Sequence, residues 1–77
     1  GKVENTQNVE GVQVIAVIKD SAAAKAGILR NDSITSINGQ KVTTPDELIS
    51  LIRKYKGSDI DVGYLRNGKS SITVASI

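Results

Sequence analysis

The stretch from Ser21 to Val42 reads SAAAKAGILRNDSITSINGQKV, and its order of caps, glycines and apolar residues decides the fold of this chain. A serine that can cap a helix precedes a run of alanines, and Gly27 supplies the left-handed residue at which a short helix ends. The segment SITSI, residues 33–37, alternates polar and apolar residues as a strand does, and Asn38-Gly39 is typical of a tight hairpin turn. The stretch therefore predicts a short helix, a strand and a short return strand QKV.

The residues before this stretch predict further strands. Residues 11–18, GVQVIAVI, are rich in β-branched side chains and apolar on both faces, which indicates a central strand. Residues 1–5, GKVEN, predict a short strand, and residues 6–10, TQNVE, a polar loop.

The longer helix is the clearest element, in residues 43–57, TTPDELISLIRKYKG. Thr44 is the predicted cap, Pro45 occupies the first helical position, and Glu47 completes a capping box. Gly57 is the predicted stop. The apolar residues recur at spacings of three and four, which gives one apolar stripe: Leu48, Leu51, Ile52 and Tyr55.

A second hairpin completes the chain, because DIDVGYLR and KSSITVAS flank Asn67-Gly68. Helices do not alternate regularly with strands, so a parallel α/β sheet is not expected. We predict an α+β fold, a small bent antiparallel β-sheet or partly open barrel closed by two helices. The 77 residues are enough for one domain, residues 1–77, with a modest core.

Composition argues against most catalytic chemistry. The chain has no histidine, which excludes a Ser-His-Asp triad within it, and with no cysteine either it offers no transition-metal site. A Ser-Lys dyad is formally possible, but nothing in the pattern singles one out. The carboxylate pairs Asp46-Glu47 and Asp59-Asp61 are expected to be structural, and no glycine-rich phosphate loop precedes a helix. We predict a non-catalytic domain with no cofactor and no metal.

Charge gives little indication of a nucleic-acid partner. The net charge is +2, and the one basic cluster, Arg53, Lys54 and Lys56, falls at the predicted end of the longer helix, where cations are favourable. No run approaches the ~18 apolar residues of a membrane span, so membrane insertion is not expected. Gly1 suggests an excised or processed chain.

The segment GVQVIAVIKDSAAAKAGILRNDSITSINGQKV resembles the central block of bacterial PDZ domains, and DELISLIRKYKGSDIDVGYLRNGKSSITV is similar to the downstream part of that family. The resemblance implies the circularly permuted strand order of bacterial PDZ domains. Two positions depart from the family pattern: Ala22 stands where proline is common, and Asn31 replaces a glycine at a position of positive φ. The pattern is most similar to PDZ domains of HtrA/Deg-type envelope serine proteases. Carboxy-terminal processing proteases and site-2 proteases carry related domains.

The resemblance implies that the domain binds peptides by strand addition to a sheet edge and holds a terminal carboxylate with backbone N–H groups. The residues implied in peptide binding are Gly1, Lys2, Val3, Glu4, Asn5, Glu47, Leu48 and Leu51. Gly1 would be the loop glycine and Val3 the first pocket residue, although the hydrophobic residues that normally precede the glycine are missing. Leu48 and Ile52 are expected to point into the core, and Leu51 and Glu47 toward the groove, with a further core leucine as the alternative for Leu51.

The implied partners are peptides or unfolded protein C-termini, together with the protease domain of a parent chain. The implied location is the bacterial periplasm or cell envelope. An alternative is a second PDZ domain that joins protomers and binds no peptide, because the GKVEN edge is short. An independent enzyme has no positive support in the sequence, and a nucleic-acid binder is supported only by the mild basicity of the chain.

Overall fold

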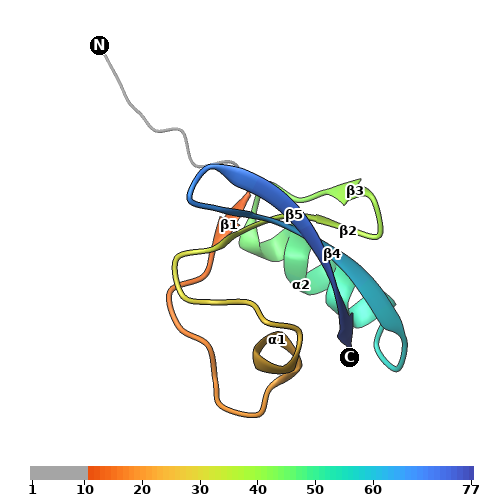
Figure 1. The fold of residues 1–77 in the computed structure, drawn as a ribbon. Helices are drawn as coiled ribbons and strands as arrows, with labels where there is room; N and C mark the ends of the chain where they lie inside the picture. The colour runs from red at the N-terminus through yellow and green to blue at the C-terminus, as the bar shows by residue number, and fades with distance from the viewer. Residues whose placement is uncertain (1–10) are drawn as a thin grey trace.

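The computed structural model describes residues 11–77, which form two helices and a five-stranded antiparallel sheet (Figure 1). The elements in chain order are β1 (Val12–Gln13), α1 (Ala22–Lys25), β2 (Ser33–Ile37), β3 (Gln40–Lys41), α2 (Pro45–Lys54), β4 (Asp59–Arg66) and β5 (Lys69–Ser76). This architecture confirms the predicted α+β fold with a small, bent antiparallel sheet and two helices.

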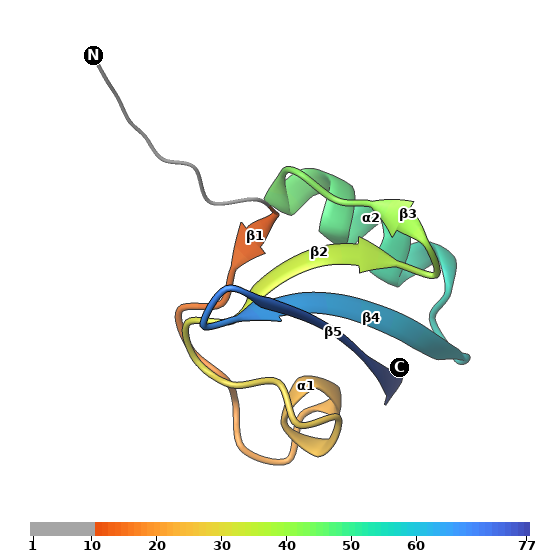
Figure 2. The ribbon, with the colours of Figure 1, turned by 45° about the horizontal axis from the view of Figure 1, so that its top comes forward.

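The sheet has the order β1-β2-β4-β5, and β3 pairs with β2 as the second half of a hairpin. β4 and β5 are paired along their whole length, from Arg66 opposite Lys69 to Asp59 opposite Ser76. An irregularity between Ile34 and Ser36 bends β2 where it pairs with β4, and such a bulge increases local twist. The sheet therefore curves, as Figure 2 shows for β2, β4 and β5.

The two predicted hairpin turns are confirmed. Asn38 and Gly39 have φ angles of 50° and 82°, and Asn67 and Gly68 have φ angles of 54° and 78°. Two successive residues with positive φ make the turn whose twist matches that of the flanking strands, and asparagine and glycine tolerate this conformation best. The sequence signal was strong here because the requirement is local.

The helices lie at opposite edges of the curved sheet (Figure 2). α2 runs behind β2, whereas α1 lies beyond β5 (Figures 1 and 2). Ser21 caps α1 by accepting a hydrogen bond from the Ala24 backbone N–H at 3.2 Å, as predicted. The core between these elements is aliphatic and consists of Ile28, Ile34, Ile37, Val42, Leu51, Ile60, Val62 and Ala75.

The prediction of a strand over residues 11–18 was wrong in extent. Only Val12 and Gln13 pair in the ladder, and β1 lies at the edge of the sheet formed by the described residues. Beyond it, Val14 still donates to the Asp32 carbonyl at 2.7 Å, but the chain then turns away toward α1. Ile15 and Ile18 are 79% and 77% exposed, so their β-branched character did not reflect burial in a sheet.

A buried ion pair attaches the end of α1 to the second hairpin. Asp32 is 2% exposed and accepts bonds from Arg66 Nε at 2.9 Å, from the second guanidinium nitrogen of Arg66 at 2.7 Å, and from the Leu29 backbone N–H at 2.8 Å. Arg66 also donates to the Gly27 carbonyl at 2.8 Å. These hydrogen bonds to the charged carboxylate, those from Arg66 first, hold the pKa of Asp32 below its ordinary value against the effect of burial. The neighbouring Asn31 has φ 78°, as expected for a residue that replaces glycine.

Candidate functional site

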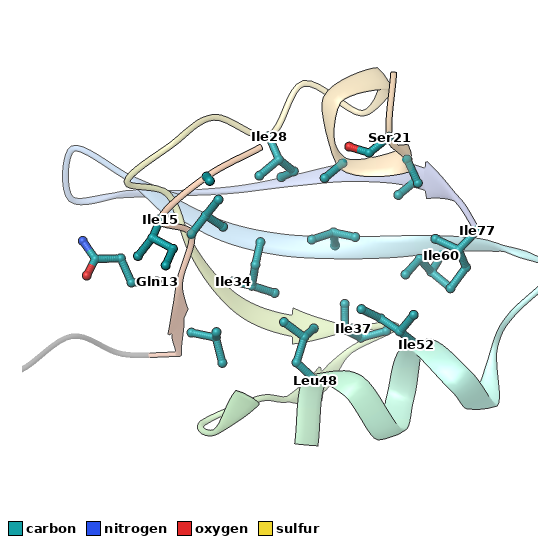
Figure 3. Close-up of a pocket in the computed structure, with 17 residues that line it drawn as sticks. Gln13, Ile15, Ser21, Ile28, Ile34, Ile37, Leu48, Ile52, Ile60 and Ile77 are labelled. Atoms are coloured by element: carbon teal, nitrogen blue, oxygen red, sulfur yellow. The ribbon is translucent and has the colours of Figure 1, made fainter. Parts of the chain in front are cut away.

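An apolar groove runs over the inner face of the sheet between α1 and α2 (Figure 3). Its volume is about 480 Å³, and it is open to solvent. Ligand pockets of roughly 300–1,000 Å³ accept small molecules or a few side chains. The groove is therefore large enough to receive more than one side chain of an extended peptide.

Three elements supply the walls of this groove, and the sheet supplies its floor. Leu48 and Ile52 extend from α2 toward the sheet, while Ile28 and Ser21 lie on the α1 side, as Figure 3 shows. β1 and the residues after it close one end. The floor consists of Ile34, Ile37, Ile60, Val62 and Ala75. Among the described residues that line the groove, no side chain is charged, so the lining selects apolar ligand groups.

The orientation of α2 corrects the expectation from its sequence. Leu51 is only 8% exposed and belongs to the core, whereas Ile52 is 37% exposed and lines the groove. Leu48 is half-buried, packs against the core and also lines the groove. Leu48 therefore packs against the core as expected and also lines the groove, whereas Ile52, expected in the core, lines the groove. Leu51 is the further core leucine that was the alternative for this residue.

The N-terminus of α2 is held by the predicted capping box. Glu47 accepts hydrogen bonds from the backbone N–H groups of Thr43 and Thr44 at 2.9 and 3.1 Å, and from Thr43 Oγ1 at 2.6 Å. Thr44 Oγ1 in turn accepts from the Glu47 N–H at 3.2 Å. The bonds from Thr43 are the main reason why the pKa of Glu47 lies below its ordinary value. Glu47 thus fixes the start of the helix instead of facing the apolar groove.

A second, more polar hollow of about 310 Å³ lies on the other side of α2. It is lined by Gln40, Lys41, Asp46, Glu47, Ser50 and Leu51. Two of the residues expected at the peptide site, Glu47 and Leu51, are therefore brought together here, while Leu48 is in the apolar groove.

The outer edge of β1 lies beside the groove. Val12 is opposite Ile34 and Gln13 is opposite Ser33, and within residues 11–77 no strand pairs with the other side of β1. Gly11, at the start of β1, has φ 80°, and a Cβ there would collide with the Ile34 carbonyl oxygen. Glycine therefore permits the close approach of β1 to β2. The predicted residues Gly1, Lys2, Val3, Glu4 and Asn5 lie outside the described part of the chain.

Sequence reasoning did not find Ile52, Val14 or the isoleucines of the floor as site residues. The spacing of four between Leu48 and Ile52 did indicate that they share one face of the helix. The spacing carried no information on whether that face packs against the core or lines the groove, because both are apolar.

Within residues 11–77, no cluster of three or more histidine, cysteine, aspartate or glutamate side chains is placed to hold a metal ion. No described helix has the length and apolar character needed to cross a bilayer.

Comparison with known proteins defines the class. The profile of the PDZ domain family matches residues 2–75, and the chain belongs to this family. It is 40% identical over 70 residues to a probable periplasmic serine protease, do/HhoA-like, from Haemophilus influenzae, covering 90% of this chain and 15% of that protein. It is 34% identical over 59 residues to the zinc metalloprotease RasP of Shouchella clausii, covering 77% of this chain and 14% of that protein.

Among solved structures, the chain is similar to an HtrA-type protease, AlgW with decapeptide, at 30% identity and a TM-score of 0.79, covering 86% of this chain and 21% of that one. The matched part of these proteases is the PDZ domain, a non-catalytic module. The chain therefore spans about one seventh to one fifth of the length of these relatives. These findings confirm the resemblance to PDZ domains of HtrA-type proteases.

Proposed function

We propose that this domain binds extended peptides with apolar side chains, by strand addition beside the groove between β1 and α2. The observation that carries the proposal is the open apolar groove of about 480 Å³, which is walled by α2 and by β1 with the residues after it. In strand addition, main-chain hydrogen bonds supply general affinity and pockets select alternate side chains. The HtrA-type relative that is described with a decapeptide supports this function.

The side-chain contacts of the proposed site come from α2 and from the sheet. Leu48 and Ile52 would contact the apolar side chains of the ligand, and these two replace Leu51 as the helix contribution. Gly1 to Asn5 remain our prediction for the pairing strand and the carboxylate loop. A free C-terminus is the expected ligand end, although the described lining offers it no cation.

For the parent protein we propose a periplasmic serine protease of the HtrA type that acts in protein quality control, in which this domain presents peptides or unfolded C-termini to a protease domain. Identity and coverage are higher for the do/HhoA-like relative, 40% over 90% of this chain, than for RasP, 34% over 77%. The match to a zinc metalloprotease fits the alternative parent, a site-2 protease.

A titration of the isotope-labelled chain with a pool of peptides that end in free hydrophobic C-termini tests the proposal. We expect amide shifts at β1, Leu48 and Ile52, with dissociation constants no tighter than about 1 μM, because one strand with shallow pockets buries little area. Peptides with amidated ends report whether a carboxylate contributes. Absence of shifts at these residues with every peptide would refute the proposal.

Substitution of Ile52 provides the residue-level prediction. Ile52→Asp introduces a charge into the apolar groove at a side chain that is 37% exposed, and we expect it to weaken peptide binding at least about tenfold. Ile49→Asp is the matched control, because Ile49 is on the same helix, is 47% exposed and does not line the groove. Equal effects of the two variants on the dissociation constant would show that the groove is not the binding surface.

The assembly alternative, a second PDZ domain that joins protomers, predicts a different outcome. Ile52→Asp in the parent protein would then leave substrate capture unchanged. Loss of capture in that variant, with the oligomer size preserved, argues against the assembly role.

A further inference from the structure

The ion pair between Asp32 and Arg66 does not line the apolar groove, yet it holds the backbone on both sides of a groove residue. Arg66 donates to the Gly27 carbonyl at 2.8 Å, and Asp32 accepts from the Leu29 N–H at 2.8 Å. Between these two bonded positions lies Ile28, which is 4% exposed and lines the groove on the α1 side (Figure 3). The position of this side chain therefore depends on the ion pair.

The β1 end of the groove is attached to the same point. Val14 lines the groove, and its N–H donates to the Asp32 carbonyl at 2.7 Å, while its own carbonyl accepts from the Asn31 N–H at 2.7 Å. Val14 comes after Gln13, the last residue of β1, so these two bonds hold it where the strand has ended. The position of Val14 in the groove therefore depends on where residues 31–32 lie.

Arg66 connects these residues to the centre of the sheet. It is the last residue of β4, which lies between β2 and β5 and supplies Val62 to the groove floor. Its guanidinium contacts both carboxylate oxygens of Asp32, at 2.9 and 2.7 Å, and the Gly27 carbonyl as well. A planar guanidinium directs several bonds at once, which fixes geometry in a way that a single ammonium cannot.

We propose that Asp32 and Arg66 are positioning residues of the peptide groove, which set the places of Ile28 and Val14 relative to the floor and so determine peptide affinity. This inference rests on the proposed peptide-binding function. Neither residue contacts the ligand in this proposal, because neither lines the groove. Their contribution is to hold the walls before the ligand arrives, which removes the cost of ordering them on binding.

Arg66→Lys tests the proposal, because lysine keeps the positive charge opposite Asp32 but cannot form the planar set of bonds. In the free variant we expect the amide signal of Val14 and the methyl signals of Ile28 to shift. Binding of a peptide chosen from the hydrophobic C-terminal pool should weaken at least about threefold. Urea unfolding shows that the variant is folded and gives the folded fraction with which the dissociation constant is corrected.

Hydrogen exchange separates a displaced wall from a general loss of stability. The Val14 amide should exchange at least about tenfold faster in Arg66→Lys than in the wild type, relative to the change at the Val42 amide. The Val42 N–H donates to the Thr35 carbonyl at 2.9 Å and reports on the sheet itself. A pair that only stabilised the fold would change the exchange of both amides alike and leave the affinity of the folded domain unaltered.

Arg53→Lys is the matched control, since it makes the same chemical change at an exposed arginine on α2. Its signals, exchange and peptide affinity should equal those of the wild type. If Arg66→Lys leaves the affinity of the folded fraction unchanged, whether or not the Val14 and Ile28 signals move, the inference is overturned.

The response of Ile52→Asp distinguishes this failure from failure of the proposed function. Loss of binding in Ile52→Asp together with wild-type affinity in Arg66→Lys overturns the positioning role alone and leaves the groove as the peptide site. A wild-type chain that binds no peptide of the pool overturns the proposed function and, with it, this inference.

Discussion

At the scale of single residues, Asp32 is the most deeply buried charged side chain of the described residues. Its carboxylate is 2% exposed and receives three hydrogen bonds, two of them from Arg66. A buried charge is tolerated only when its partners compensate the lost hydration. Removal of the carboxylate leaves the Leu29 N–H and the guanidinium of Arg66 without this acceptor.

We predict that Asp32→Asn lowers the free energy of unfolding by about 2 kcal/mol near neutral pH, because a buried, charge-assisted pair is broken. The pKa of Asp32 is lowered in the folded state, so its contribution is present above the unfolded-state pKa of about 4 and is lost as the pH falls through the lower folded-state pKa. The difference between the wild type and the variant should therefore narrow in acid. Urea denaturation at about pH 7, 4 and 2.5 measures it.

The control for this prediction is Asp20→Asn, which removes the same charge at an exposed position. It should change stability by less than about 0.5 kcal/mol. If both variants unfold alike at every pH, the Asp32–Arg66 pair does not contribute in the way its geometry indicates.

At the scale of elements, α2 is defined by its cap and by one apolar stripe that meets both the core and the groove. The capping box satisfies backbone N–H groups that have no partner within the helix. Pro45 occupies the first helical position, where the N–H that proline lacks would have no partner within the helix. Leu51 attaches the helix to the core, Ile52 faces the groove, and Leu48, which lies between them, contacts both. The helix therefore serves both the fold and the proposed site.

Thr44→Ala is expected to lower the free energy of unfolding by about 1 kcal/mol, because the N-cap side chain no longer accepts from the Glu47 N–H. Thermal or urea unfolding at neutral pH measures this effect. Ser50→Ala, an exposed change within the same helix, is the control and should be neutral or slightly stabilising, because alanine favours helix. A loss of equal size in both variants would contradict the role of the cap.

At the scale of the whole molecule, the proposed peptide site uses only one face of the sheet. Val62 and Ala75 lie in the floor of the groove on the inner face, whereas Ile72 and Val74 are exposed on the other face of the sheet. The sheet therefore separates Ile72 and Val74 from the proposed peptide site.

This separation predicts that Ile72→Lys leaves peptide affinity unchanged within about twofold, since effects at distant sites without shared contacts are close to additive. The peptide titration of this variant measures the effect. A large loss of peptide affinity would show that the outer face of β5 contributes to the peptide site.

The sequence by itself determined the features whose causes are local. Both Asn-Gly turns, the capping box and the strands of the second hairpin follow from the conformations that asparagine, glycine and threonine prefer within a few residues of chain. The order of these signals was also enough to indicate the α+β class and the likeness to PDZ domains.

Only the tertiary structure decided which apolar residues are buried in the core and which remain accessible to a ligand. Ile52 and Leu51 differ little in character, yet one lines the groove and the other is in the core. Ile15 and Ile18 have strand-like side chains but are exposed, because the chain leaves the sheet after Gln13 to reach α1. The hydrophobic effect favours burial without specifying a partner, so the direction of each face depends on contacts between segments far apart in the sequence.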